Sequence, residues 1–288
     1  MAPVVEGRPV EVAPGVVVVP DRRAPLVPNV GVVVGDRAAL VVDTGLGPGN
    51  GAIVRGIARE LAGDRPLVLT LTHFHPEHGY GAQAFGGATI VYNRAQRDEL
   101  RDKGQGYLAM FRGLGADVAH ELEGVELVQP HVVYDGAAEL DLGGRVVELR
   151  SLGPAHSRGD QVVFLPEERI LFTGDLVETR SFPIVPFFPP HDVDVDGRAW
   201  IAVLEALERL GPGAVVPGHG EIGDGALLGA TRGYLTLLEA ETTRRAADGR
   251  DGDAIVAELE PRLRERYPDW DNPEWIAFGV RSVLARAR

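Results

Sequence analysis

The segment THFHPEHG, residues 72–79, holds three histidines and one glutamate within six consecutive positions. Imidazoles and carboxylates are the groups that bind zinc, iron and manganese when no thiolate is available, and this chain contains no cysteine. We therefore predict that His73, His75, Glu77 and His78 are metal ligands. For the glutamate, the alternative interpretation is an acid favoured by the dipole at the start of a helix, with no metal contact.

Three further residues of ligand type stand in glycine-containing segments after apolar, strand-like runs. His156 lies in LGPAHSRGD, Asp175 in LFTGDLV and His219 in VVPGHGE. Glycine allows the tight turns and the close backbone approach that a binding site needs. Because strand ends can converge at one edge of a sheet, we expect these residues to meet the histidine segment in space.

Together these residues suffice for two metal ions that keep open positions for water. Asp175 is predicted to bridge the two ions. The other predicted ligands are His73, His75 and His156 for one ion, and Glu77, His78 and His219 for the second.

The surrounding pattern indicates which elements carry these residues. PLVLTLT, residues 66–72, is typical of a buried strand, and a short helix follows the histidine segment. Residues 51–63 form a helical pattern with apolar side chains four positions apart. The order of strands followed by helix occurs twice, which predicts two α/β halves with helices outside two sheets. We expect one domain over residues 1–225, with a helical segment at 226–288 packed on it.

Composition argues against several classes of protein. The 288 residues carry a net charge of −13, which disfavours a nucleic acid as the partner. No apolar run reaches 18 residues, so we expect no membrane span. The N-terminal segment lacks a basic region followed by a long apolar stretch, so no secretory leader is expected. A cytoplasmic location and a small-molecule substrate are the remaining expectations.

The order of these motifs resembles the metallo-β-lactamase superfamily. The shared pattern is H-x-H-x-E-H at 73–78, a lone histidine, then Gly-Asp and Gly-His-Gly, and LVVDTG at 40–45 is similar to an early turn of that family. The resemblance covers residues 10–225 and implies an α/β fold, a four-layer αβ/βα sandwich with metals at one edge and here a helical C-terminal extension. Glu77 departs from the family, which usually has Asp there, and this leaves the position and occupancy of the second metal open.

The resemblance also implies an activity. The family includes hydroxyacylglutathione hydrolases, lactonases, β-lactamases and some redox enzymes. We expect a hydrolase in which a metal-activated hydroxide attacks an ester, lactone, thioester or β-lactam carbonyl, with Asp175 and Glu77 as catalytic residues. The expected cofactor is zinc, two ions per chain, with iron or manganese as alternatives. An iron-dependent oxidoreductase or dioxygenase on the same fold, and a non-catalytic metal-bound module, are the competing hypotheses.

Other residues are candidates for supporting roles. Asp43, in LVVDTG, is expected to hold the turn or a ligand histidine in place rather than to bind metal. The stretch SFPIVPFFPP, residues 181–190, is either core, a homodimer surface or an apolar lip over the site. The candidate substrate contacts are Phe182, Phe187, Phe188, His191 and Tyr107.

Overall fold

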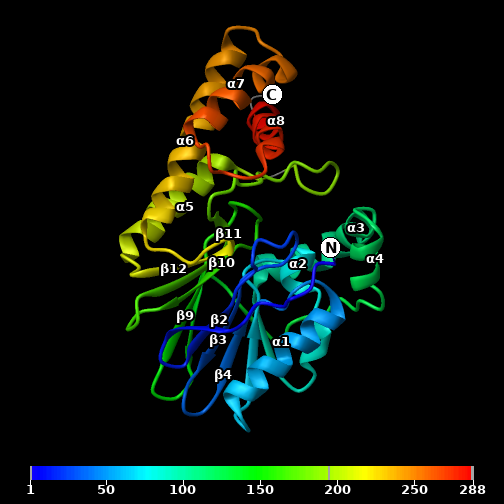
Figure 1. Cartoon of the computed structure of the whole chain (residues 1–288), viewed down its shortest axis with the longest axis vertical. Coiled ribbons are helices and arrows are strands. Elements are labelled where there is room, and N and C mark those ends of the chain that lie inside the picture. The colour runs from blue at the N-terminus through cyan, green and yellow to red at the C-terminus, as the bar shows by residue number, and fades with distance from the viewer. Residues whose placement is uncertain (1, 194, 287–288) are drawn as a thin grey trace.

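Two β-sheets lie at the centre of the structure, a computed structural model that describes residues 2–193 and 195–286 (Figure 1). The first sheet has its strands in chain order: β1 (Val10–Ala13), β2 (Val16–Val19), β3 (Val30–Val34), β4 (Ala39–Val42), β5 (Leu67–Thr70), β6 (Thr89–Asn93) and β7 (Val132–Tyr134). The second sheet has the order β12 (Ala214–His219), β11 (Ile170–Glu178), β10 (Gln161–Leu165), β9 (Val146–Ser151) and β8 (Ala137–Asp141).

Helices connect these strands and extend the chain at its C-terminal end. The helices are α1 (Gly47–Ala62), α2 (Pro76–Gly79), α3 (Arg94–Arg112), α4 (Ala116–Glu121), α5 (Gly197–Leu210), α6 (Ala226–Ala247), α7 (Gly252–Arg266) and α8 (Ile276–Arg286), with short 3₁₀ turns η1 (Ala82–Phe85) and η2 (Pro273–Trp275). Within the described ranges, no helix combines the length and the apolar character that crossing a membrane requires.

Three separate hydrophobic clusters define the layers. One cluster packs α1 and α3 against the first sheet, a second fills the space between the two sheets, and a third runs from the second sheet through α5 and α6 to α7 and α8. In β3, Val30 and Val32 face the helices, while Val33 faces the other sheet. Both faces of such a strand are buried, which explains why the sequence shows continuous valine runs rather than alternation. The predicted αβ/βα sandwich is therefore confirmed.

The C-terminal helices lie at one end of the molecule. Figure 1 shows α6, α7 and α8, coloured yellow-orange to red, beyond α5 and away from α1. α6 packs along α5, and α8 packs against α6. α6 begins at Ala226, next to the boundary expected from the sequence, and the division into a domain and a helical segment stays a prediction.

The packing of the two sheets depends on one close approach. A Cβ atom on Gly31 of β3 would lie 2.5 Å from the ring of Phe172 on β11.

We expect Gly31→Ala to lower the free energy of unfolding by about 1–3 kcal/mol, because the ring must move in a filled core. Urea unfolding measures this, and Phe172→Leu in the same background should recover part of the loss. The control is Gly56→Ala in α1, where a Cβ meets no atom within 4 Å and stability should rise by about 0.5–1 kcal/mol. Equal stability of Gly31→Ala and the wild type would contradict this packing.

Candidate metal centre

The histidine segment lies in the connection between β5 and β6. His73 and His75 lie in the loop that follows β5, and Glu77 and His78 lie in the single turn of α2. His75 is extended and precedes Pro76, the first residue of α2. Proline at that position suits a helix start because its missing N–H would have no helical partner. This short turn directs four ligand-type side chains to the same buried region.

The remaining three ligand-type residues come from the second sheet. His156 lies in the loop between β9 and β10, and His219 is the last residue of β12. The prediction that Asp175 ends its strand was wrong, because β11 continues to Glu178. Gly174 has a positive φ of 52°, and the pairing of β11 with β12 is irregular around it. This bulge turns the Asp175 side chain toward the histidine segment without ending the strand.

Asp175 lies between two groups of imidazoles. Its Oδ2 is 3.8 Å from Nε2 of His73 and 3.7 Å from Nε2 of His156. Its Oδ1 is 3.2 Å from Nε2 of His78 and 3.6 Å from Nε2 of His219. Each carboxylate oxygen thus faces one pair of histidines, which is the arrangement that a residue bridging two cations requires.

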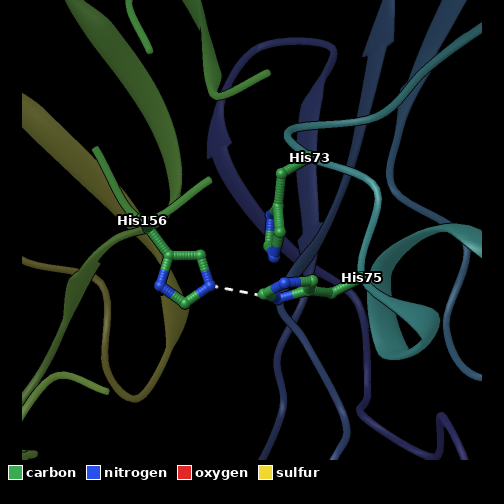
Figure 2. Close-up of side chains that lie close together, drawn as sticks. All are labelled: His73, His75 and His156. Atoms are coloured by element: carbon green, nitrogen blue, oxygen red, sulfur yellow. Dashed lines mark hydrogen bonds between the residues drawn. The ribbon is translucent and has the colours of Figure 1, made fainter. Parts of the chain in front are cut away.

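The groups on the two sides of Asp175 each contain enough ligand atoms for one ion. Ligand atoms of His73, His75 and His156 lie within 4.8 Å of one another, and Figure 2 shows the three rings converging from the histidine loop and the β9–β10 loop. Nδ1 of His75 is 3.1 Å from Nε2 of His156. The second group, with its ligand atoms also within 4.8 Å, is Glu77, His78, Asp175 and His219.

Hydrogen bonds fix which ring nitrogen faces the centre. Nδ1 of His156 is 3.2 Å from the carbonyl of Ile184, and Nδ1 of His219 is 2.9 Å from the carbonyl of Val27. A carbonyl oxygen can only accept, so Nδ1 carries the proton in both rings and Nε2 presents a lone pair to the centre. Such support of the distal nitrogen is the usual arrangement for histidines that bind metal.

Asp43 supports His78 in the same way. Its Oδ2 lies 2.9 Å from Nδ1 of His78 and accepts from the hydroxyl of Thr72, and its Oδ1 accepts from the backbone N–H of Thr72 at 2.7 Å. Asp43 itself has a φ of 67°, a left-handed conformation that Asp and Asn tolerate better than most residues. The geometry thus matches a residue that holds a ligand rather than one that binds metal.

Burial and charge set the protonation of the centre. Burial holds the pKa of His73 and His75 well below the ordinary value and lowers the pKa of His156 to about 4. Burial also disfavours the charged form of His78, but the carboxylates of Asp175 and Asp43 outweigh it and raise its pKa well above the ordinary value. A field that favours an imidazolium at this point also favours a bound cation.

The donor set fits a metal because its atoms lack other partners. Among the described residues, Nε2 of His73 and Nε2 of His78 are buried and find no hydrogen-bond partner, and the same holds for Oε2 of Glu77 and Oδ1 of Asp175. Buried polar atoms are almost always paired, since an unpaired one costs free energy. Four such atoms in one region are explained together if divalent cations bind there.

A glycine leaves room for the Asp175 carboxylate. A Cβ on Gly218 of β12 would overlap Oδ1 of Asp175. Gly218 is thus required at the position before His219 for steric reasons, which gives a physical meaning to the Gly-His-Gly pattern at 218–220.

A cavity of about 700 Å³ opens above the centre. Some of the candidate substrate contacts line this cavity, and the others lie elsewhere. Tyr107 and Phe188 line it. Phe182 is fully buried among Tyr234, Tyr267 and Trp270 instead, so its prediction as a substrate contact was wrong. Tyr234 lies in α6, and Tyr267 and Trp270 lie in the segment between α7 and η2.

Phe187 and His191 are likewise absent from the described residues that line the cavity. Both are partly buried, and the ring of His191 packs close to Gly106 in α3 and 6.2 Å from the ring of Tyr107. His191 therefore supports α3 in this structure rather than contacting the cavity.

Sequence reasoning missed several residues of the site. Glu178, three positions after Asp175, is buried and lines the cavity, and its Oε1 has no hydrogen-bond partner in the part of the chain that the structure describes. Burial and the nearby Asp175 raise its pKa well above the ordinary value. The continuation of β11 past Gly174 is the signal that would have revealed it. Trp275 and Phe278 also line the cavity, and no motif marks them.

Comparison with known proteins agrees with this geometry. The model of the family described as "Metallo-beta-lactamase superfamily" matches residues 23–219. The chain therefore belongs to the metallo-beta-lactamase superfamily.

It is 24% identical over 248 residues to a linear primary-alkylsulfatase of Pseudomonas sp. (strain ATCC 19151), covering 71% of this chain and 46% of that protein. It is 26% identical over 171 residues to an acyl-coenzyme A thioesterase of Bos taurus, covering 56% and 59%. The chain thus spans about half the length of these relatives.

Solved structures show the same fold. The sec-alkylsulfatase Pisa1 from Pseudomonas sp. superposes with a TM-score of 0.75 at 16% identity, over 97% of this chain and 50% of that one. A metallo-beta-lactamase from Pontibacter korlensis superposes with a TM-score of 0.62 at 20% identity, over 80% and 98%.

The support of His78 by Asp43 gives a test on metal affinity. We expect Asp43→Asn, which keeps the size and tolerates the left-handed backbone, to weaken binding of one of two zinc ions about 10–100-fold. Titration against a chromophoric zinc chelator, followed by elemental analysis, measures this. Asp64→Asn, at an exposed acid in the turn after α1, is the control and should leave both affinities unchanged. Unaltered zinc affinity in Asp43→Asn would contradict the support role.

Proposed function

We propose that this chain is a metal-dependent hydrolase that cleaves an ester-type carbonyl substrate, namely an ester, lactone, thioester or β-lactam, with an activated water. The observation that carries the proposal is the set of buried donor atoms without partners that surround Asp175 at the floor of the 700 Å³ cavity. A cavity with a few converging polar groups is the usual form of a substrate site.

The proposed metals are zinc, two per chain, held by His73, His75 and His156 on one side of Asp175 and by Glu77, His78 and His219 on the other. A divalent cation at such a site supplies a Lewis acid for the carbonyl oxygen and lowers the pKa of a bound water to about 7. The nitrogen and oxygen donors also suit iron or manganese.

The protein side chains have separate proposed roles. Asp175 faces both groups and would orient the attacking water between them. Burial raises the pKa of Glu77, which makes its carboxyl a better proton acceptor if it does not bind metal. Tyr107 stacks on His75 with ring centroids 4.8 Å apart, and its buried hydroxyl has no hydrogen-bond partner among the residues described. That hydroxyl is the proposed donor to the substrate.

A sulfate ester is the second candidate substrate. The sequence match to the linear primary-alkylsulfatase extends over 248 residues, whereas the match to the thioesterase extends over 171. The relatives named as a sulfatase and a thioesterase both favour hydrolysis over the iron-dependent oxidoreductase. The open cavity above the donor set disfavours a non-catalytic module. A cytoplasmic location and a homodimer stay predictions.

Hydrolysis can be tested with a substrate panel. The panel contains 4-nitrophenyl esters, a simple thioester, a lactone, a chromogenic cephalosporin and an alkyl sulfate. We expect turnover of at least one compound by the zinc-loaded protein, its loss on complete chelation, and its return with added zinc. Asp175→Ala should lower the hydrolytic activity by more than about 100-fold, the loss that removal of a supporting residue causes, because Asp175 faces both groups of ligand-type residues.

Asp64→Asn serves again as the matched acid that is remote from the cavity. Activity that persists after metal analysis shows complete removal would refute the proposal. Stoichiometric iron together with oxygen consumption, and no hydrolysis, would favour the oxidoreductase instead.

A further inference from the structure

The cavity above the candidate metal centre has two different parts. Its floor consists of ligand-type residues, among them His75, Glu77 and Asp175. Its outer wall is apolar and comes from three remote parts of the chain. The side chains of this apolar wall are Met110, Phe111, Leu114, Phe188, Trp275 and Phe278.

The C-terminal part of the apolar wall is held firmly in place. The backbone N–H of Phe182 donates to the carbonyl of Asp271 at 3.0 Å, and the N–H of Asp271 donates to the carbonyl of Arg180 at 2.9 Å. The side-chain amide of Asn272 donates to the hydroxyl of Ser181 at 3.0 Å. These bonds join the start of η2 to the segment that follows β11, which carries Asp175.

Aromatic packing closes the wall further out. The rings of Phe188 and Phe278 meet edge to face with centroids 5.2 Å apart. Trp275 and Phe278 both lie outside residues 23–219, the part that matches the family model. Half-buried Trp275 on one side and exposed Leu114 on the other leave apolar surface available to a ligand.

Charge offers little attraction for a highly charged ligand. Histidines aside, Arg23 is the only basic residue among the described residues that line the cavity. Its guanidinium is already paired with Glu221 and Asp271. The net charge of −13 adds no attraction for an anionic ligand. Burial of apolar surface is therefore the main source of binding energy that the outer cavity can supply.

We propose that the apolar wall binds an unbranched hydrocarbon chain of the substrate, so that chain length determines specificity. The substrate class is a single-chain ester or thioester whose reacting group lies at the floor and whose chain lies between α3 and segment 271–278. This inference rests on the proposed hydrolase function for the reacting group, but not for the binding of the chain.

Binding of linear carboxylic acids tests the chain site without any reaction. The probes are butyric, hexanoic, octanoic and decanoic acid, measured by isothermal titration calorimetry on the zinc-loaded protein. Full burial contributes about 0.8 kcal/mol per methylene, so affinity should rise about fourfold with each added methylene. Affinity that is independent of length, or no binding of any acid, would overturn the proposal.

Variants of the apolar wall locate the effect. Trp275→Ala should lower the affinity for decanoic acid about tenfold or more and that for butyric acid by much less. Leu114→Asp, at a residue 57% exposed, changes the wall without disturbing the core and should also reduce the dependence on length. Ile53→Ala, at a residue 39% exposed on α1, is the control and should behave as the wild type. If the two wall variants lose the same fraction of affinity for every acid, whatever its length, a site for the hydrocarbon chain is contradicted.

Hydrolysis of 4-nitrophenyl butyrate, octanoate and decanoate separates this inference from the proposed function. If no ester is cleaved but acid binding still rises with length, the hydrolase proposal fails and the chain site stands. If the esters are cleaved with a kcat/KM that does not depend on length, the chain site fails and the hydrolase stands.

Discussion

The structure depends on the placement of one buried carboxylate between two groups of imidazoles. Asp175 is 4% exposed, and its two oxygens lie within 3.2–3.8 Å of four histidine Nε2 atoms. Placing so many polar groups in the interior without hydrogen bonds is costly unless another partner satisfies them. Divalent cations are that partner in our account, and they would convert mutual repulsion among lone pairs into coordination.

The two sheets position the two halves of the candidate metal centre against each other. The first sheet supplies the histidine segment and Asp43, and the second supplies His156, Asp175 and His219. Valine-rich strands buried on both faces keep the sheets at a fixed separation, so the ligands from distant segments do not have to be ordered individually. Gly218 then permits the close approach of β12 to β11, and Gly174 permits the close approach of β11 to Thr72.

Much of the centre could be predicted because each ligand stands in a local pattern of its own. His73, His75 and His78 crowd one loop, and Asp175 and His219 follow apolar runs and stand beside glycine. The outer cavity could not be predicted in this way. Trp275 reaches it only because Asp271 and Asn272 bind the backbone and side chain of residues 180–182, some 90 positions earlier. Phe182 was misassigned for the same reason, since α6 and the segment after α7, which bury it, carry no local sign of that contact.

The central claim is that two cations bind on opposite sides of the Asp175 carboxylate. Anomalous diffraction at the zinc edge, from crystals of the zinc-loaded protein, tests it most directly. Our account predicts two peaks per chain, one beside His73, His75 and His156 and one beside His78 and His219, with Asp175 between them. A single peak remote from Asp175, or no peak at the histidine segment, would contradict it.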